Sequence, residues 1–181
     1  MVEAMSIVAQ PEDLAQRIAR LRVAGHEVFL NPDGTFERSE LNAICALWRE
    51  KAKGGLPART EFGLRDLAPF LRHVAILERT AAGRYRYRFY GSALVAMTGE
   101  GTNRFLDEHI PAEHYAATKA DFDLILAHGE PLRFVIEYRS PRLDYLYGES
   151  FAAALASPAG PPATILGATY LKAKVGGKSL D

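Results

Sequence analysis

The fold is decided by residues 84–99, whose sequence is RYRYRFYGSALVAMTG. In the first half of this stretch arginines alternate with aromatic residues, which is the period of a β-strand with two different faces. Gly91 follows the strand, and residues 92–98 favour a short helix that ends at Gly99. The stretch therefore predicts a strand that leads directly into helices.

Further strand-like runs lie on both sides of this stretch. Short turns connect neighbouring strand-like runs, and strands connected in this way are typical of antiparallel hairpins. A long helical block, with its main helix at 112–128 between Pro111 and Gly129, separates the first two strands from the last three. This order predicts an α+β fold in which helices cover one face of an antiparallel sheet. The five predicted strands are 73–79, 84–91, 132–140, 145–155 and 164–172.

The chain divides into a main domain with flanking segments. Residues 1–36 are predicted to be an N-terminal extension with one amphipathic helix, and 37–56 a flanking helix whose apolar stripe includes Trp48. The main domain is expected at 57–175, and 176–181 form a C-terminal tail. Because helices as short as the first one are marginal alone, we expect the N-terminal helices to dock, and a homodimer through them or through the sheet face is the predicted assembly.

Composition narrows the class of protein. Lys plus Arg and Asp plus Glu both total 22, so there is no overall basic field to hold nucleic acid or an anionic membrane. Cys45 is the only cysteine, which excludes an internal disulfide and fits a reducing compartment. The sequence has no secretory signal and no apolar run of the roughly 20 residues that span a bilayer. The expected location is the cytoplasm.

Three stretches resemble PAS sensory domains, and more specifically the alphaproteobacterial single-domain PAS proteins. They are the LPAR sequence at 56–59, residues 85–95, and the loop at 101–111. The resemblance implies a five-stranded antiparallel sheet, helices across its inner face and a pocket between them. It also implies ligand or redox sensing, with dimerisation through the sheet or the N-terminal helices.

The same resemblance bears on cofactors. Photosensory flavin-binding members have the motif Gly-x-Asn-Cys-Arg-Phe-Leu, whereas here Asn103 is followed directly by Arg104. Because the motif cysteine is missing and Cys45 lies elsewhere, flavin-adduct photochemistry is not expected. Haem-sensing members use a histidine on or near the long helix, which makes His114 the candidate haem ligand. The identity of any cofactor is otherwise open.

The apolar faces of these elements give the candidate pocket residues. They suit a mainly apolar ligand, although the same side chains would also fill a closed core. Glu149 shares strand parity with three aromatic residues, so it either faces inward with a partner or turns outward at a bulge, and the outward orientation is favoured. The candidates are Tyr87, Phe89, Tyr115, Phe122, Phe134, Ile136, Tyr138, Tyr147 and Glu149.

Catalytic motifs are incomplete. The glycine-rich run at 99–104 does not follow a strand, and the sequence around Ser150 lacks the last glycine of a nucleophile elbow. The histidines are not at metal-ligand spacing. We therefore expect a non-enzymatic sensory module that binds a ligand or a partner protein. A ligand-free dimerisation domain and a small isomerase- or dehydratase-like enzyme, with Glu149 or His114 as general base, are the alternatives.

Overall fold

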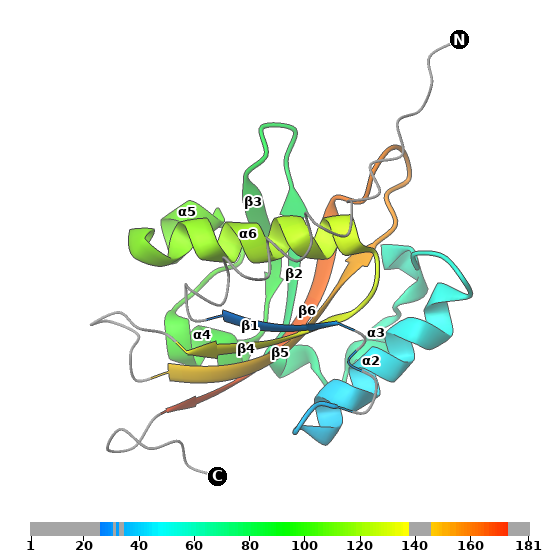
Figure 1. Cartoon of the computed structure of the whole chain (residues 1–181), viewed down its shortest axis with the longest axis horizontal. Helices are drawn as coiled ribbons and strands as arrows, with labels where there is room; N and C mark the ends of the chain where they lie inside the picture. Colours follow the sequence, from blue (N-terminus) through cyan, green and yellow to red (C-terminus); the bar gives the residue numbers. More distant parts are fainter. Residues whose placement is uncertain (1–25, 31, 33–34, 138–145, 174–181) are drawn as a thin grey trace.

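The structure is a computed structural model, and it describes residues 26–30, 32, 35–137 and 146–173. Its centre is a six-stranded antiparallel sheet in the order β1-β4-β5-β6-β2-β3 (Figure 1). The strands are β1 (His26–Leu30), β2 (Val74–Arg79), β3 (Tyr85–Tyr90), β4 (Leu132–Glu137), β5 (Leu146–Leu155) and β6 (Thr164–Ala173). The helices are α2 (Ser39–Ala52), α3 (Leu64–Leu67), α4 (Ser92–Thr98), α5 (Leu106–His109) and α6 (Ala112–His128), with short 3-10 turns η1 (Arg59–Glu61) and η2 (Leu71–His73).

The predicted α+β fold is confirmed, and the sheet is wider than expected. Strand β1 pairs with β4 and adds a sixth strand at one edge. It comes from the segment that we assigned to the N-terminal extension, where only a brief strand-like run was visible. The helix predicted within 1–25 and the tail at 176–181 lie outside the described residues.

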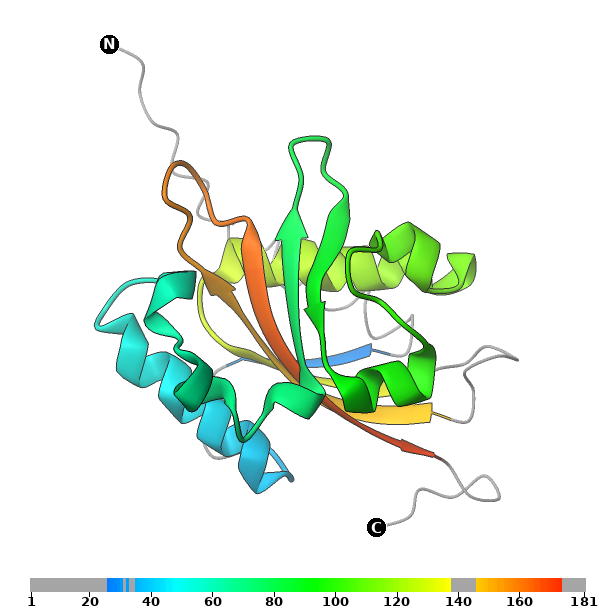
Figure 2. The same cartoon turned by 180° about the vertical axis from the view of Figure 1, so that it is seen from behind.

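Helices cover both faces of the sheet rather than one. Helices α4, α5 and α6 lie over the inner face, while α2 and α3 pack against the other, which we call the outer face (Figures 1 and 2). The apolar stripe of α2 fits against β5, and its Trp48 is buried within the chain. This stripe is therefore not available as the dimer surface that we expected, because the chain's own sheet covers it.

A β-bulge in β3 changes which side chains face inward. Tyr87 lies opposite Leu77, but Phe89 lies opposite Ile76, so β3 has one extra residue at this point. Beyond the extra residue, the side chains of β3 therefore alternate in the opposite sense between the two faces of the sheet. Tyr87 and Tyr90 consequently join the inner core, whereas Phe89 packs with the outer core.

The junction between β3 and α4 requires a residue without a side chain. A Cβ added at Gly91 would lie 2.4 Å from the carbonyl oxygens of both Leu71 and Arg72, whereas one at Gly167 would meet nothing closer than 3.7 Å. We expect Gly91→Ala to lower the free energy of unfolding by about 2 kcal/mol, because backbone must move to admit the methyl group. Gly167→Ala is the matched control and should be neutral or slightly stabilising. Urea titration measures both, and equal effects would contradict the close approach at Gly91.

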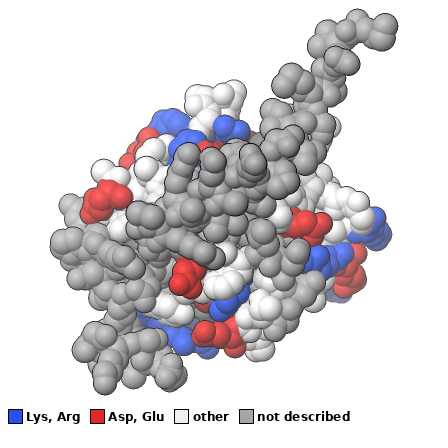
Figure 3. Space-filling view, viewed as in Figure 1, with Lys and Arg blue, Asp and Glu red and all other residues white. Residues whose placement is uncertain are grey.

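Charges of both signs are present on the face of the molecule that faces the viewer in Figure 1. Acidic and basic side chains are interspersed on the face shown in Figure 3, in keeping with the zero net charge of the sequence. Across the described ranges, the helices are too short or too polar to cross a membrane.

Candidate functional site

A cavity of about 380 Å³ lies between the inner face of the sheet and helices α4 to α6. Its volume falls within the range of small-molecule pockets. Most of the lining is carbon, which suits a ligand with an apolar body. The lining residues are Ala75, Leu77, Tyr87, Tyr90, Leu94, Thr98, Glu108, His109, Ile110, Pro111, His114, Thr118, Asp121, Phe122, Ile125, Phe134, Ile136, Ser150, Ala152, Ile165, Gly167, Thr169 and Leu171.

Small residues on the central strands leave room for the cavity. Ser150 and Ala152 of β5, Gly167 of β6 and Ala75 of β2 all line it. On β5, the large side chain of Phe151 points to the outer face instead. The alternation of small and large residues along β5 therefore leaves space on the inner face of this strand.

The least exposed polar residue in the lining is Asp121. This residue is only 3% exposed and lies on α6, one turn before Leu124 and Ile125 of the inner core. Across the cavity, the hydroxyl groups of Ser150 and Thr169 hydrogen-bond each other at 2.8 Å. A ligand held here would thus meet a carboxyl group on the helix side and hydroxyl groups on the sheet side.

His109 forms an aromatic corner of the cavity with two tyrosines. The ring centroids of Tyr87 and Tyr90 lie 5.3 Å and 5.0 Å from that of His109, and all three pairs are edge-to-face. Both ring nitrogens of His109 are buried and make no hydrogen bond of good geometry with a described residue. Burial, with a further contribution from the Arg104 guanidinium, lowers the pKa of His109. The imidazole is therefore neutral at neutral pH and able to donate one hydrogen bond and accept another.

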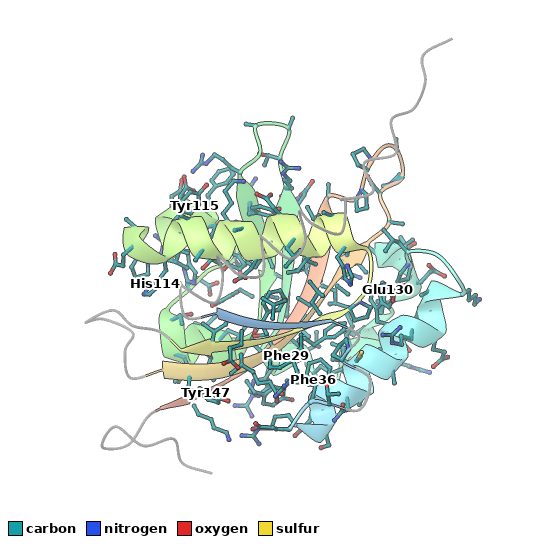
Figure 4. The ribbon with its side chains drawn as sticks, in the orientation of Figure 1. Phe29, Phe36, His114, Tyr115, Glu130 and Tyr147 are labelled. Carbon is teal, nitrogen blue, oxygen red and sulfur yellow. The ribbon has the colours of Figure 1, made fainter. Side chains whose placement is uncertain are left out.

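Four of the nine predicted pocket residues line the cavity: Tyr87, Phe122, Phe134 and Ile136. His114, the predicted haem ligand, lines it as well. Tyr115, next to it on α6, packs against the inner core without being part of the lining (Figure 4). Tyr138 lies outside the described residues.

The remaining three candidates, Phe89, Tyr147 and Glu149, are not in the cavity lining. Phe89 is turned to the outer face by the bulge in β3. Tyr147 and Glu149 lie on the same face of β5 as Phe151, which belongs to the outer core. Figure 4 shows Tyr147 on the side of the sheet away from α6. Glu149 thus faces outward as favoured, but in a regular strand and not at a bulge.

Glu149 is buried on the outer face by the segment that leads into α2. Its carboxylate accepts hydrogen bonds from the backbone N–H groups of Glu37 at 3.0 Å and Arg38 at 3.2 Å, and from Nε of Arg133 at 2.6 Å. Such a carboxylate, held by three donors, orders the start of the flanking helix. Its position explains why Glu149 is 4% exposed without being part of the cavity.

Sequence reasoning missed Asp121 and His109. A signal for Asp121 was present, since it precedes Leu124 by three residues and Ile125 by four and so lies on the apolar face of its helix. No comparable signal exists for His109, because the short helix α5 gives no periodicity. Within the described ranges, no group of three or more His, Cys, Asp or Glu side chains is placed to hold a metal ion.

The chain is thus an α+β domain in which helices cross an antiparallel sheet over a ligand-sized cavity. A family model described as PAS domain matches residues 36–170, and the chain therefore belongs to the PAS domain family. Domains of this family are in general sensory or signalling modules. No curated protein matches the chain.

Several solved structures are similar to the chain. One is the LOV protein of Rhodobacter sphaeroides, with 14% identity, a TM-score of 0.39, and coverage of 77% of this chain and 71% of that chain. A variant of RsLOV has 14% identity, a TM-score of 0.38 and coverage of 78% and 73%. An RNA-binding light-oxygen-voltage receptor has 13% identity and a TM-score of 0.40; the likeness covers 80% of this chain but only 38% of the receptor.

Proposed function

We propose that this PAS domain is a non-enzymatic sensor that binds a small ligand in the cavity under α6. The observation that carries the proposal is the cavity itself, which is about 380 Å³ in volume and lined mainly by carbon. A closed, ligand-free core would have no need of the small residues at Ser150, Ala152 and Gly167 beneath the helix. The signal would leave by contact with a partner protein.

The positions of the reactive side chains favour binding over catalysis. Glu149, one of two candidates for a general base, faces away from the cavity and accepts three hydrogen bonds. Cys45 is buried in the outer core, on the opposite face of the sheet from the cavity, which supports the expectation that no cysteinyl flavin adduct forms. His114 does line the cavity, and its role as a haem ligand stays a prediction.

Self-association remains part of the proposal. The homodimer would use surfaces other than the Trp48 stripe, since that stripe is buried against β5. A cytoplasmic location likewise stays an expectation.

Filling the cavity tests the proposed function. We expect native mass spectrometry to detect a ligand bound to the wild-type chain. A ligand added at 100 times its dissociation constant should raise the free energy of unfolding by about 2.7 kcal/mol. Ala152→Leu places three extra carbons in the cavity and should abolish both the bound mass and the stabilisation. Ala43→Leu makes the same change on the exposed face of α2 and should behave as wild type.

Circular dichroism shows whether the Ala152→Leu variant keeps the fold. A wild-type chain with no bound mass and no melting shift across a metabolite library would contradict the sensor proposal. That result would favour the ligand-free dimerisation domain.

A further inference from the structure

The hydroxyl groups of Ser150 and Thr169 form a pair on the sheet side of the cavity. The two residues are register partners on β5 and β6, both line the cavity, and their hydroxyl oxygens are 2.8 Å apart. Two hydroxyl groups bring two hydrogens, and the bond between them uses only one. Within the described part of the chain, neither hydroxyl group has a second hydrogen-bond partner. One O–H group of the pair therefore has no acceptor in the described structure.

Carbon surrounds this hydroxyl pair. Phe134 of β4 lies opposite Ser150, and Ala152 and Gly167 face each other one step further along the same side of the sheet. Ser150 is 7% exposed, and an O–H group without an acceptor at such a position costs free energy. The small residues Ala152 and Gly167 leave space beside the pair, so an atom of a ligand can approach it.

A hydroxyl group that lacks an acceptor selects the chemistry of the ligand. A carbonyl oxygen can accept its hydrogen, whereas an ammonium group offers donors only. A carboxylate also accepts, but it brings a full charge into a lining that is mostly carbon and that, among the described residues, contains no Lys or Arg. An uncharged carbonyl group meets both conditions.

We propose that the cavity binds an uncharged carbonyl compound, whose carbonyl oxygen accepts a hydrogen bond from the Ser150–Thr169 hydroxyl pair. The inference rests on the proposed function and adds the chemical class of the ligand. The apolar body of the ligand would lie against Phe134, Ile136 and Ala152 on the sheet.

Three probes of similar size test the inference: acetophenone, α-methylstyrene and benzoate. α-Methylstyrene has a C=CH₂ group in place of the C=O group of acetophenone and is the more hydrophobic of the two, so a cavity without a hydrogen-bond donor would prefer it. Chemical-shift titration of the ¹⁵N-labelled full chain at neutral pH should instead show acetophenone binding about threefold or more tightly than α-methylstyrene. Benzoate should bind more weakly than acetophenone.

Variants of the pair assign this preference to its hydroxyl groups. The double variant Ser150→Ala/Thr169→Val removes both groups at nearly constant volume and should bind α-methylstyrene more tightly than acetophenone. Each single variant keeps one hydroxyl group, no longer bonded to the other, and should keep a preference for acetophenone. Thr164→Val makes the same change on the opposite face of β6, outside the cavity lining, and should leave all three affinities unchanged.

The outcomes separate the inference from the proposed function. Binding of α-methylstyrene by the double variant shows that the cavity is kept. If α-methylstyrene or benzoate binds the wild type as tightly as acetophenone does, or if the double variant keeps the preference for acetophenone, the carbonyl inference is wrong and the sensor proposal stands. If none of the three probes binds the wild type, the inference fails, and the bound mass in native mass spectrometry decides the sensor proposal by itself.

Discussion

Replacing Trp48 by alanine is expected to lower the free energy of unfolding by about 3–5 kcal/mol. The indole is 2% exposed and packs between α2 and the outer face of the sheet. Its Nε1 also donates a hydrogen bond to the carbonyl oxygen of Ala154 in β5, at 3.1 Å. Truncation therefore opens a large void and leaves a buried carbonyl without its donor.

Two variants of the same helix calibrate the effect of Trp48→Ala. Trp48→Phe keeps most of the apolar volume and should cost about 1–2 kcal/mol, chiefly for the lost hydrogen bond and the smaller ring. Glu50→Ala changes an exposed position and should stay within about 0.5 kcal/mol of the wild type. Urea unfolding gives these free energies, and sedimentation gives the oligomeric state. A Trp48→Ala chain that keeps its stability but changes from dimer to monomer would overturn the intramolecular packing and restore the stripe as a dimer surface.

Local sequence signals were sufficient to predict most elements of the fold. The helix predicted at 112–128 coincides with α6, because Pro111 and Gly129 mark its two ends. The strand predicted at 84–91 matches β3 to within a residue at each end, since its alternation has a period of two. Edge strand β1 was missed as part of the sheet, because five residues next to a turn do not indicate their pairing partner.

The orientation of β5 could not be predicted from alternation. Alternation shows that Tyr147, Glu149 and Phe151 share a face, but not which face points to α6. We included Tyr147 among the pocket candidates, and Glu149 with its outward orientation favoured, whereas in the structure neither lines the cavity and Ser150 and Ala152 lie under it. The helix on the second face decides this, since it buries the large side chains and leaves space on the inner face.

The candidate site was predictable where strands are regular. Phe134 and Ile136 line the cavity from the face that the alternation of β4 gives them, and Tyr87 does so from β3. Phe89 was misplaced because nothing in the repeating arginine and aromatic pattern reveals the bulge at that point. Asp121 was missed, although its helical spacing from Leu124 and Ile125 places it on the apolar face of α6.

Replacing Glu149 by alanine is expected to cost about 3–5 kcal/mol of unfolding free energy without weakening ligand binding in the cavity. The carboxylate accepts hydrogen bonds from two backbone N–H groups and from Arg133. Its removal leaves the Arg133 side chain, which is 11% exposed, buried without its closest counter-charge. Among the described residues, the guanidinium then keeps the 3.8 Å contact with exposed Glu37 and its position over the ring of Phe29.

A double-mutant cycle isolates the ion pair from the backbone hydrogen bonds. Arg133→Met keeps the aliphatic length of the side chain. The double variant Arg133→Met/Glu149→Ala should lose less unfolding free energy than the two single variants lose together, and the difference should be about 1–3 kcal/mol. Glu149→Gln retains an acceptor oxygen and should cost less than Glu149→Ala. Native mass spectrometry of each folded variant, which detects a bound ligand, reports on the cavity. If Glu149→Ala leaves stability unchanged but removes binding, Glu149 faces the cavity after all. If the unfolding free energy of Glu149→Ala falls while ligand binding is unchanged, the carboxylate serves to fix α2 on the outer face. Strand β5 then carries the ligand site on one face and the flanking helix on the other.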